Sequence, residues 1–197
     1  MWGIVQDGSI TKLINKPKGM VIGDIRYSRK IFELWSKAEL EAKGIYEVEY
    51  DNTNQKDETW YINTDLSFAF AGGKITASYG SATARPHADV LFTAQDESDG
   101  KGTEGEVAVE GLKTIKIREI KKQAAGELAK TDWYVVRKAD AGTAVPSAIT
   151  THRAAVRTKA AEQETAITNA ADTAAIETLY TYVDGSRPLG ELPTLES

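Results

Sequence analysis

The chain has 197 residues and a net charge of -5, with 24 basic side chains, 29 acidic side chains and no cysteine. The missing cysteine excludes a disulfide framework, a zinc–thiolate cluster and a cysteine nucleophile, and the acidic balance argues against a nucleic-acid partner. No apolar stretch approaches the roughly 18 residues that span a bilayer, and the amino end lacks a signal-peptide pattern. We therefore expect a soluble protein, made in the cytoplasm, with no membrane partner.

The first 44 residues predict two short strands followed by helix. Apolar residues surround the turn-forming pair Asp7-Gly8, which is typical of a small hairpin or an extended arm. Residues 28–44 predict one helix or two short ones, because Ser36 and Glu39 have capping-box spacing inside the segment. Gly44 is the expected end. One helical face would bury four apolar residues, Ile31, Leu34, Trp35 and Ala38.

Residues 45–80 alternate between apolar and polar side chains, which is the pattern of half-buried strands. The alternations 66–70 and 75–79 mirror each other across the loop 71–74, which contains two glycines. The sequence therefore predicts an antiparallel β-meander, with one further strand at 90–92.

Residues 95–111 are rich in Asp, Glu and Gly and show no apolar periodicity, so we expect a solvated linker that ends an N-terminal domain of residues 1–94. The segment 100–105 matches a dinucleotide-binding glycine pattern. It follows an acidic loop rather than a strand, however, and its carboxylates would repel phosphate.

Residues 112–183 predict a second, helical domain. One helix is expected to run from Leu112 towards Ala141 and to end at Gly142, and a second to begin after Pro146. The second helix is rich in alanine, and small residues favour a close antiparallel helical hairpin. Its apolar stripe is interrupted at two polar positions, Arg153 and Gln163. Prolines mark residues 184–197 as an extended tail. The predicted class is α+β, with a helix and β-meander first and an all-α hairpin second.

The candidate site residues are a group of aromatic and cationic side chains in the helical domain: Trp133, Tyr134, Arg137, His152 and Arg153. Large amphipathic side chains of this kind dominate protein interfaces. The competing interpretation, which we favour for the aromatic pair, is that it fills a small core. Neither histidine has a second histidine at metal-ligand spacing, and no nucleophile elbow is present, so we expect no metal, no cofactor and no catalytic residue.

Two parts of the chain carry a family resemblance. Residues 123–138 read QAAGELAKTDWYVVRK, residues 142–147 read GTAVPS and residues 153–157 read RAAVR; nearer the amino end, residues 31–36 read IFELWS and 39–46 read ELEAKGIY. These segments resemble the phage tail assembly chaperone-like or tail-fibre-associated proteins of marine tailed bacteriophages. His152 stands where that family has an aromatic residue before the arginine.

The resemblance implies a non-enzymatic structural protein of the virion tail, at the tail tip or fibre base, with other phage tail proteins as partners. A homo-oligomer, such as a trimer, is expected. One alternative is a transient assembly chaperone that does not remain in the virion. Another is a glycan-binding tip that would use an aromatic platform of Trp60, Tyr61, Phe68 and Tyr79.

Overall fold

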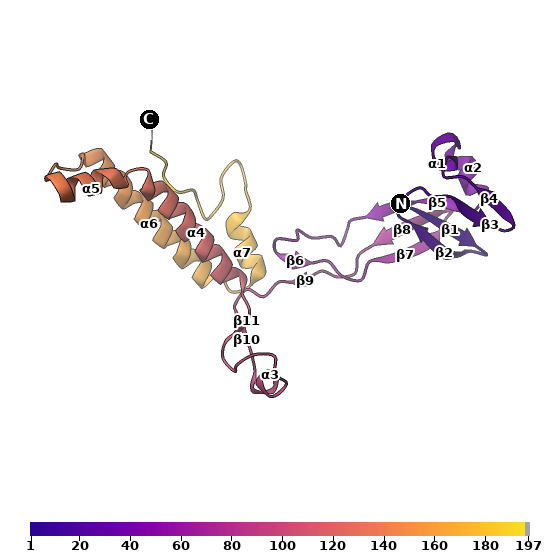
Figure 1. The fold of residues 1–197 in the computed structure, drawn as a ribbon, viewed down its shortest axis with the longest axis horizontal. Helices are drawn as coiled ribbons and strands as arrows, with labels where there is room; N and C mark the ends of the chain where they lie inside the picture. The colour runs from indigo at the N-terminus through magenta and orange to yellow at the C-terminus, as the bar shows by residue number, and fades with distance from the viewer. Residues whose placement is uncertain (196–197) are drawn as a thin grey trace. The chain divides into compact units, whose positions relative to one another are not determined.

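The computed structural model describes residues 1–195 and divides the chain into two compact units, Met1–Thr83 and Ala84 onward. The first unit is mainly β-sheet and the second is mainly helical (Figure 1). The α+β class predicted from the sequence is therefore confirmed.

The first unit is built on a five-stranded sheet with the strand order β2-β1-β5-β8-β7. Its strands are β1 (Trp2–Gln6), β2 (Ser9–Ile14), β5 (Ile45–Asp51), β7 (Ser67–Ala71) and β8 (Lys74–Ser78). Asp7 and Gly8 both have positive φ and form the tight turn of the β1–β2 hairpin, as their sequence indicates. Gly72 and Gly73 do the same between β7 and β8. Both predicted hairpins are confirmed.

The centre of this sheet differs from the predicted meander, because β5 pairs parallel to β8, with Val48 opposite Ile75. The antiparallel expectation over residues 45–80 holds for β7 and β8 but not for β5. Alternation of apolar residues identifies a strand without identifying its partner. The long segment 52–66 gives the chain room to cross over, which parallel neighbours require. The short strand β6 (Tyr61–Ile62) lies outside the sheet and is paired with β9 (Thr83–Ala84).

Of the two predicted alternatives, one helix or two short ones, the structure has the second: α1 (Ile31–Leu34) and α2 (Lys37–Glu41). The expected capping box of Ser36 and Glu39 begins α2, and it lowers the pKa of the Glu39 carboxyl through hydrogen bonds to Ser36. Because the helix is interrupted, the predicted face is not continuous: Leu34 is 75% exposed.

The first core of this unit lies where the helices meet β1, β2 and the hairpin of β3 (Met20–Ile22) and β4 (Ile25–Tyr27). Its buried members are Ile4, Ile14, Met20, Ile31, Leu40 and Ile45.

The second unit begins with a ribbon of β10 (Val90–Leu91) and β11 (Val107–Val109), joined through the short helix α3 (Ala94–Ser98). The predicted linker over 95–111 is therefore folded rather than open. Asp89 explains why: it accepts hydrogen bonds from Gly111 N (2.6 Å) and Thr114 Oγ1 (2.9 Å), which tie the ribbon to the start of the next helix and lower the pKa of Asp89.

The helical part contains α4 (Leu112–Ala129), α5 (Asp132–Ala141), α6 (Ser147–Asn169) and α7 (Thr173–Tyr180). Helices α4 and α6 form the predicted antiparallel hairpin: Lys113 Nζ donates to Thr168 O (2.8 Å), while Arg153 reaches Leu128 O (2.7 Å) at the other end. The buried residues between them are Ile120, Ala124, Val156, Ala160 and Ile167.

The predicted extended tail folds back onto these helices. Leu189 is only 2% exposed and belongs to the core between α4 and α6, and its amide donates to Leu179 O (3.0 Å). Gln163, one of the two polar residues that interrupt the apolar stripe of α6, is buried. Its Nε2 donates to Gly190 O (2.9 Å), which offsets part of the cost of burying the amide. Between Pro188 and Pro193, Leu189 is buried in this core and Leu192 packs against it.

Candidate functional site

The candidate residues gather at the joint between α4 and α5. Helix α4 ends at Ala129, and the chain turns through Lys130 and the fully buried Thr131. Thr131 Oγ1 donates to Leu128 O (3.0 Å), which satisfies one of the carbonyls left open at a helix end. Helix α5 then starts a new direction, so the single helix expected to run from Leu112 to Ala141 is two helices. The αL conformation of Gly142 ends α5 as predicted.

Arg153 holds this joint together from α6. Its Nη1 lies 2.7 Å from Leu128 O, 2.7 Å from Thr131 Oγ1 and 2.8 Å from Asp132 Oδ1. A guanidinium is an unusual group in an apolar stripe, and it is tolerated there because each of these oxygens compensates part of its desolvation. Arg153 is therefore a positioning residue for α5 rather than part of an exposed surface.

The aromatic pair lies on α5 itself. The rings of Trp133 and Tyr134 are 3.9 Å apart between centroids, and the Arg137 guanidinium lies over both, at 4.6 and 5.4 Å. The structure describes all of α5, and none of its residues is buried. Trp133 is 52% exposed and Val136 is 65% exposed. The core-filling interpretation of this pair is wrong for Trp133, because α5 packs against its neighbours along one side only.

His152 and Arg137 each have one buried side-chain nitrogen at this end of the second unit. His152 Nε2 and Arg137 Nε are both shielded from solvent, and neither meets a hydrogen-bond partner within residues 1–195. His152 is half-buried on α6, so it is not part of the exposed face of α5.

A pocket of about 350 Å³ separates α5 from α6. Cationic and aliphatic side chains share its wall: Val135, Lys138, Ala144, Val145, Thr150, Arg153 and Arg157. The sequence analysis missed Lys138 and Arg157 because they are 19 residues apart, and only the hairpin brings them to one pocket.

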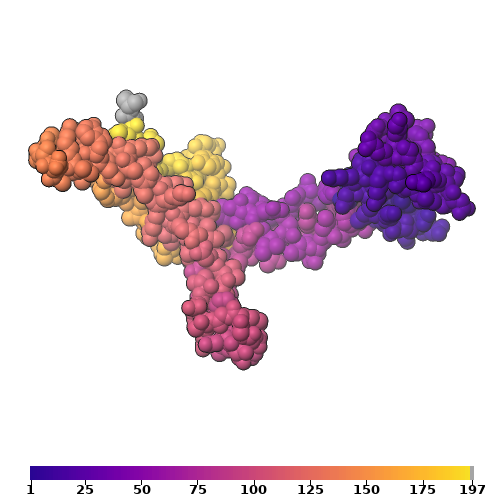
Figure 2. Space-filling model, viewed as in Figure 1, coloured from indigo at the N-terminus to yellow at the C-terminus, as the bar shows by residue number. Residues whose placement is uncertain are grey.

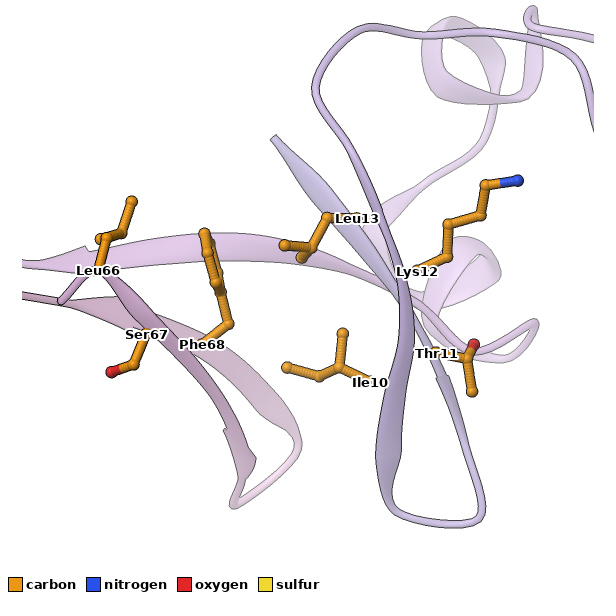
Figure 3. A pocket seen from close by; sticks show the side chains of 7 residues that line it. All are labelled: Ile10, Thr11, Lys12, Leu13, Leu66, Ser67 and Phe68. Atoms are coloured by element: carbon orange, nitrogen blue, oxygen red, sulfur yellow. The ribbon is translucent and has the colours of Figure 1, made fainter.

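The first unit contains a second surface feature, a groove of about 420 Å³ between β2 and β7 (Figure 3). These strands are the two ends of the sheet, which curls so that they approach without pairing. The side chains of Ile10, Leu13 and Phe68 point into the gap. The groove is open and its lining mixes apolar and polar side chains, and these residues include no set of groups suited to catalysis.

The aromatic platform considered for glycan binding does not form. Trp60 is 6% exposed and Tyr61 is 8% exposed, so both are part of the interior of the first unit. Phe68 and Tyr79 are partly buried. Alternation of apolar and polar residues along strands is also the pattern of core packing, and these four side chains are buried or partly buried.

Within the described part of the chain, no group of three or more His, Asp or Glu side chains is placed to hold a metal ion. No helix between residues 1 and 195 combines the length and apolarity needed to cross a membrane. The comparisons with known proteins found no match: no family model, curated protein or solved structure is similar to this chain.

Proposed function

We propose that this chain is a non-enzymatic structural protein of a phage virion tail, at the tail tip or fibre base, and that it docks on a neighbouring tail protein through α5. The docking surface is the exposed face that contains Trp133 and Val136. The tail assignment rests on the sequence resemblance, and the docking role rests on the geometry of α5.

The observation that carries the docking role is that an exposed aromatic face lies on a helix whose first turn is anchored to α6. Tryptophan and arginine are the residue types that contribute most at protein interfaces, and here Arg137 already lies over the Trp133 ring. Arg153 joins the end of α4 to the start of α5, because its guanidinium contacts Leu128 O on α4, Thr131 Oγ1 at the joint and Asp132 Oδ1 on α5. A surface held in this way loses little conformational freedom on binding, which favours affinity.

Virion proteomics tests the tail assignment. Quantitative mass spectrometry of purified phage particles should detect this chain in fixed ratio to the major tail proteins. Absence from particles, under conditions that detect minor tail proteins, together with abundance in infected-cell lysate, would instead support the transient assembly chaperone.

Variants test the docking surface. Incorporation into particles should fall in Trp133→Ser and in Val136→Ser, because each substitution removes an exposed apolar side chain from α5 and leaves the buried core residues unchanged. Val21→Ser is the matched control, since Val21 is 61% exposed on β3 and lies outside α5. Equal incorporation of all three variants would remove α5 as the docking surface.

A further inference from the structure

The loop at the tip of the β10–β11 ribbon is strongly acidic. Its carboxylates are Asp96, Glu97, Asp99, Glu104 and Glu106, against one cation, Lys101. Lys101 is already engaged by Asp96 (3.1 Å) and Asp99 (3.0 Å). Glu104 and Glu106 are exposed and form no ion pair with any described residue. The tip therefore presents uncompensated negative charge.

The acidic tip is folded, so these charges have defined positions. Thr93 and Asp96 form a capping box at the start of α3, and the hydrogen bonds from Thr93 lower the pKa of Asp96 to about 2. Phe92 exchanges backbone hydrogen bonds with the far side of the loop, donating to Glu106 O (2.9 Å) and accepting from Gly105 N (3.0 Å). The ring of Phe92 packs where a side chain on Gly102 would stand.

The pocket between α5 and α6 carries the opposite charge. Lys138 is exposed and forms no ion pair with any residue in 1–195, and Arg157 donates only a long hydrogen bond to Arg153 O (3.4 Å). Arg153 in the same pocket is paired with Asp132. Besides Asp132, the carboxylate nearest to Lys138 along the sequence is Asp140, two residues further on in α5. Two cations beside an aliphatic wall of Val135 and Val145 suit a carboxylate-bearing segment.

The two charged surfaces lie at opposite ends of α4. Asp89 ties the ribbon to the first turn of this helix, and Arg153 marks its last turn. A helix of 18 residues is about 27 Å long at a rise of 1.5 Å per residue. Figure 2 shows the ribbon as a narrow projection from the helices of this unit. The acidic tip therefore cannot reach the pocket of its own chain, but it can reach the pocket of another copy.

We propose that the acidic tip of one copy binds the cationic pocket of a second copy, with Glu104 and Glu106 facing Lys138 and Arg157. The two surfaces differ, so the contact is head-to-tail, and repetition closes it into a ring or extends it into a chain. The side chains are exposed, so the association is weak and is screened by salt. This self-association goes beyond the docking role, because it uses a different face of α5 and does not depend on the virion tail.

Charge reversal on the full-length chain tests the contact. Sedimentation velocity at low salt should show concentration-dependent self-association that is lost at high salt. E104K/E106K and K138E/R157E should each raise the dissociation constant by about tenfold or more, because each places like charges opposite one another. The quadruple variant E104K/E106K/K138E/R157E has a cationic tip and an acidic pocket, so it should regain association. D24K/E33K and K16E/K18E reverse as many exposed charges within residues 1–83 and should leave association unchanged.

Three outcomes would overturn the proposal. The first is a wild-type chain that stays monomeric at every concentration and salt tested. The second is self-association that both double variants retain. The third is a quadruple variant that is folded by circular dichroism and yet fails to associate, since this would mean that tip and pocket do not meet. Virion proteomics bears on none of these results, so this proposal and the tail assignment fail separately.

Discussion

The guanidinium of Arg153 donates a 2.7 Å hydrogen bond to the hydroxyl of Thr131, and both side chains are buried at the joint where α4 gives way to α5. The same hydroxyl donates to Leu128 O (3.0 Å), so the arginine, the threonine and the end of α4 form one hydrogen-bonded group. The direction of α5, and with it the exposure of Trp133, depends on this group.

Replacing Arg153 with methionine should lower the free energy of unfolding by about 2 kcal/mol, because Leu128 O and Thr131 Oγ1 lose the charged donor of their hydrogen bonds. Urea unfolding followed by circular dichroism measures the change. The control is Lys122→Met on the exposed side of α4, which should change stability by less than about 0.5 kcal/mol. Equal effects would show that the hydrogen-bonded group contributes nothing specific.

Leu189→Ala should destabilise the second unit by about 2–4 kcal/mol, because the side chain lies in the core beside Ile120 and Val156. Leu195→Ala is the matched control, since Leu195 is 39% exposed, and it should have little effect. Limited proteolysis gives a second readout: residues after Tyr180 should become sensitive in Leu189→Ala alone. A resistant tail in that variant would contradict the docking of this segment.

Gly44→Ala should cost more than Gly72→Ala, although both glycines have positive φ. At Gly72 a new Cβ meets open space, so the expected cost is the backbone strain alone, about 1–2 kcal/mol. At Gly44 the Cβ would also lie 2.6 Å from Val5 O, in the connection that closes β1 against β5. Thermal unfolding of the two variants measures the difference, and equal melting temperatures would show that the Val5 contact relaxes freely.

Stability should fall between pH 10 and 12 because of Tyr180. Burial raises the pKa of its phenol to about 12, and the charge of Glu119 adds to this effect. An unfolded tyrosine ionises near pH 10, so the unfolded state releases its proton first and gains stability as the pH rises. Since Tyr180 is only half-buried, we expect about 1 kcal/mol of extra loss relative to Tyr180→Phe. Unfolding curves of both proteins at pH 9.5 and 11.5 measure it, and parallel losses would contradict the prediction.

Local chemistry was well predicted from the sequence. A few neighbouring residues determine each of four features: the turns at Asp7-Gly8 and Gly72-Gly73, the capping box at Ser36 and the end of α5 at Gly142. Their conformations follow from side-chain hydrogen bonds and from the freedom of glycine, which no distant contact overrides here.

Relationships across the fold were harder to predict. The parallel pairing of β5 and β8 was missed because Val48 and Ile75 alternate in the same way whichever direction their strands run. The pocket of Lys138 and Arg157 was missed because it exists only once α5 turns back towards α6. Arg153 was predicted as an interface residue from its charge, whereas its position in the apolar stripe of α6 already indicated burial.

Every pairing of the five-stranded sheet lies within residues 2–78, and its central parallel pair joins residues 27 positions apart. Strand β5 therefore cannot be paired along its second edge until β8 has left the ribosome, whereas no pairing of this sheet depends on α4. We expect the first unit to fold as a block while the helices are still being synthesised. In an arrested nascent chain that exposes only residues 1–83, the sheet should already be resistant to protease, and a chain that ends before Lys74 should not be.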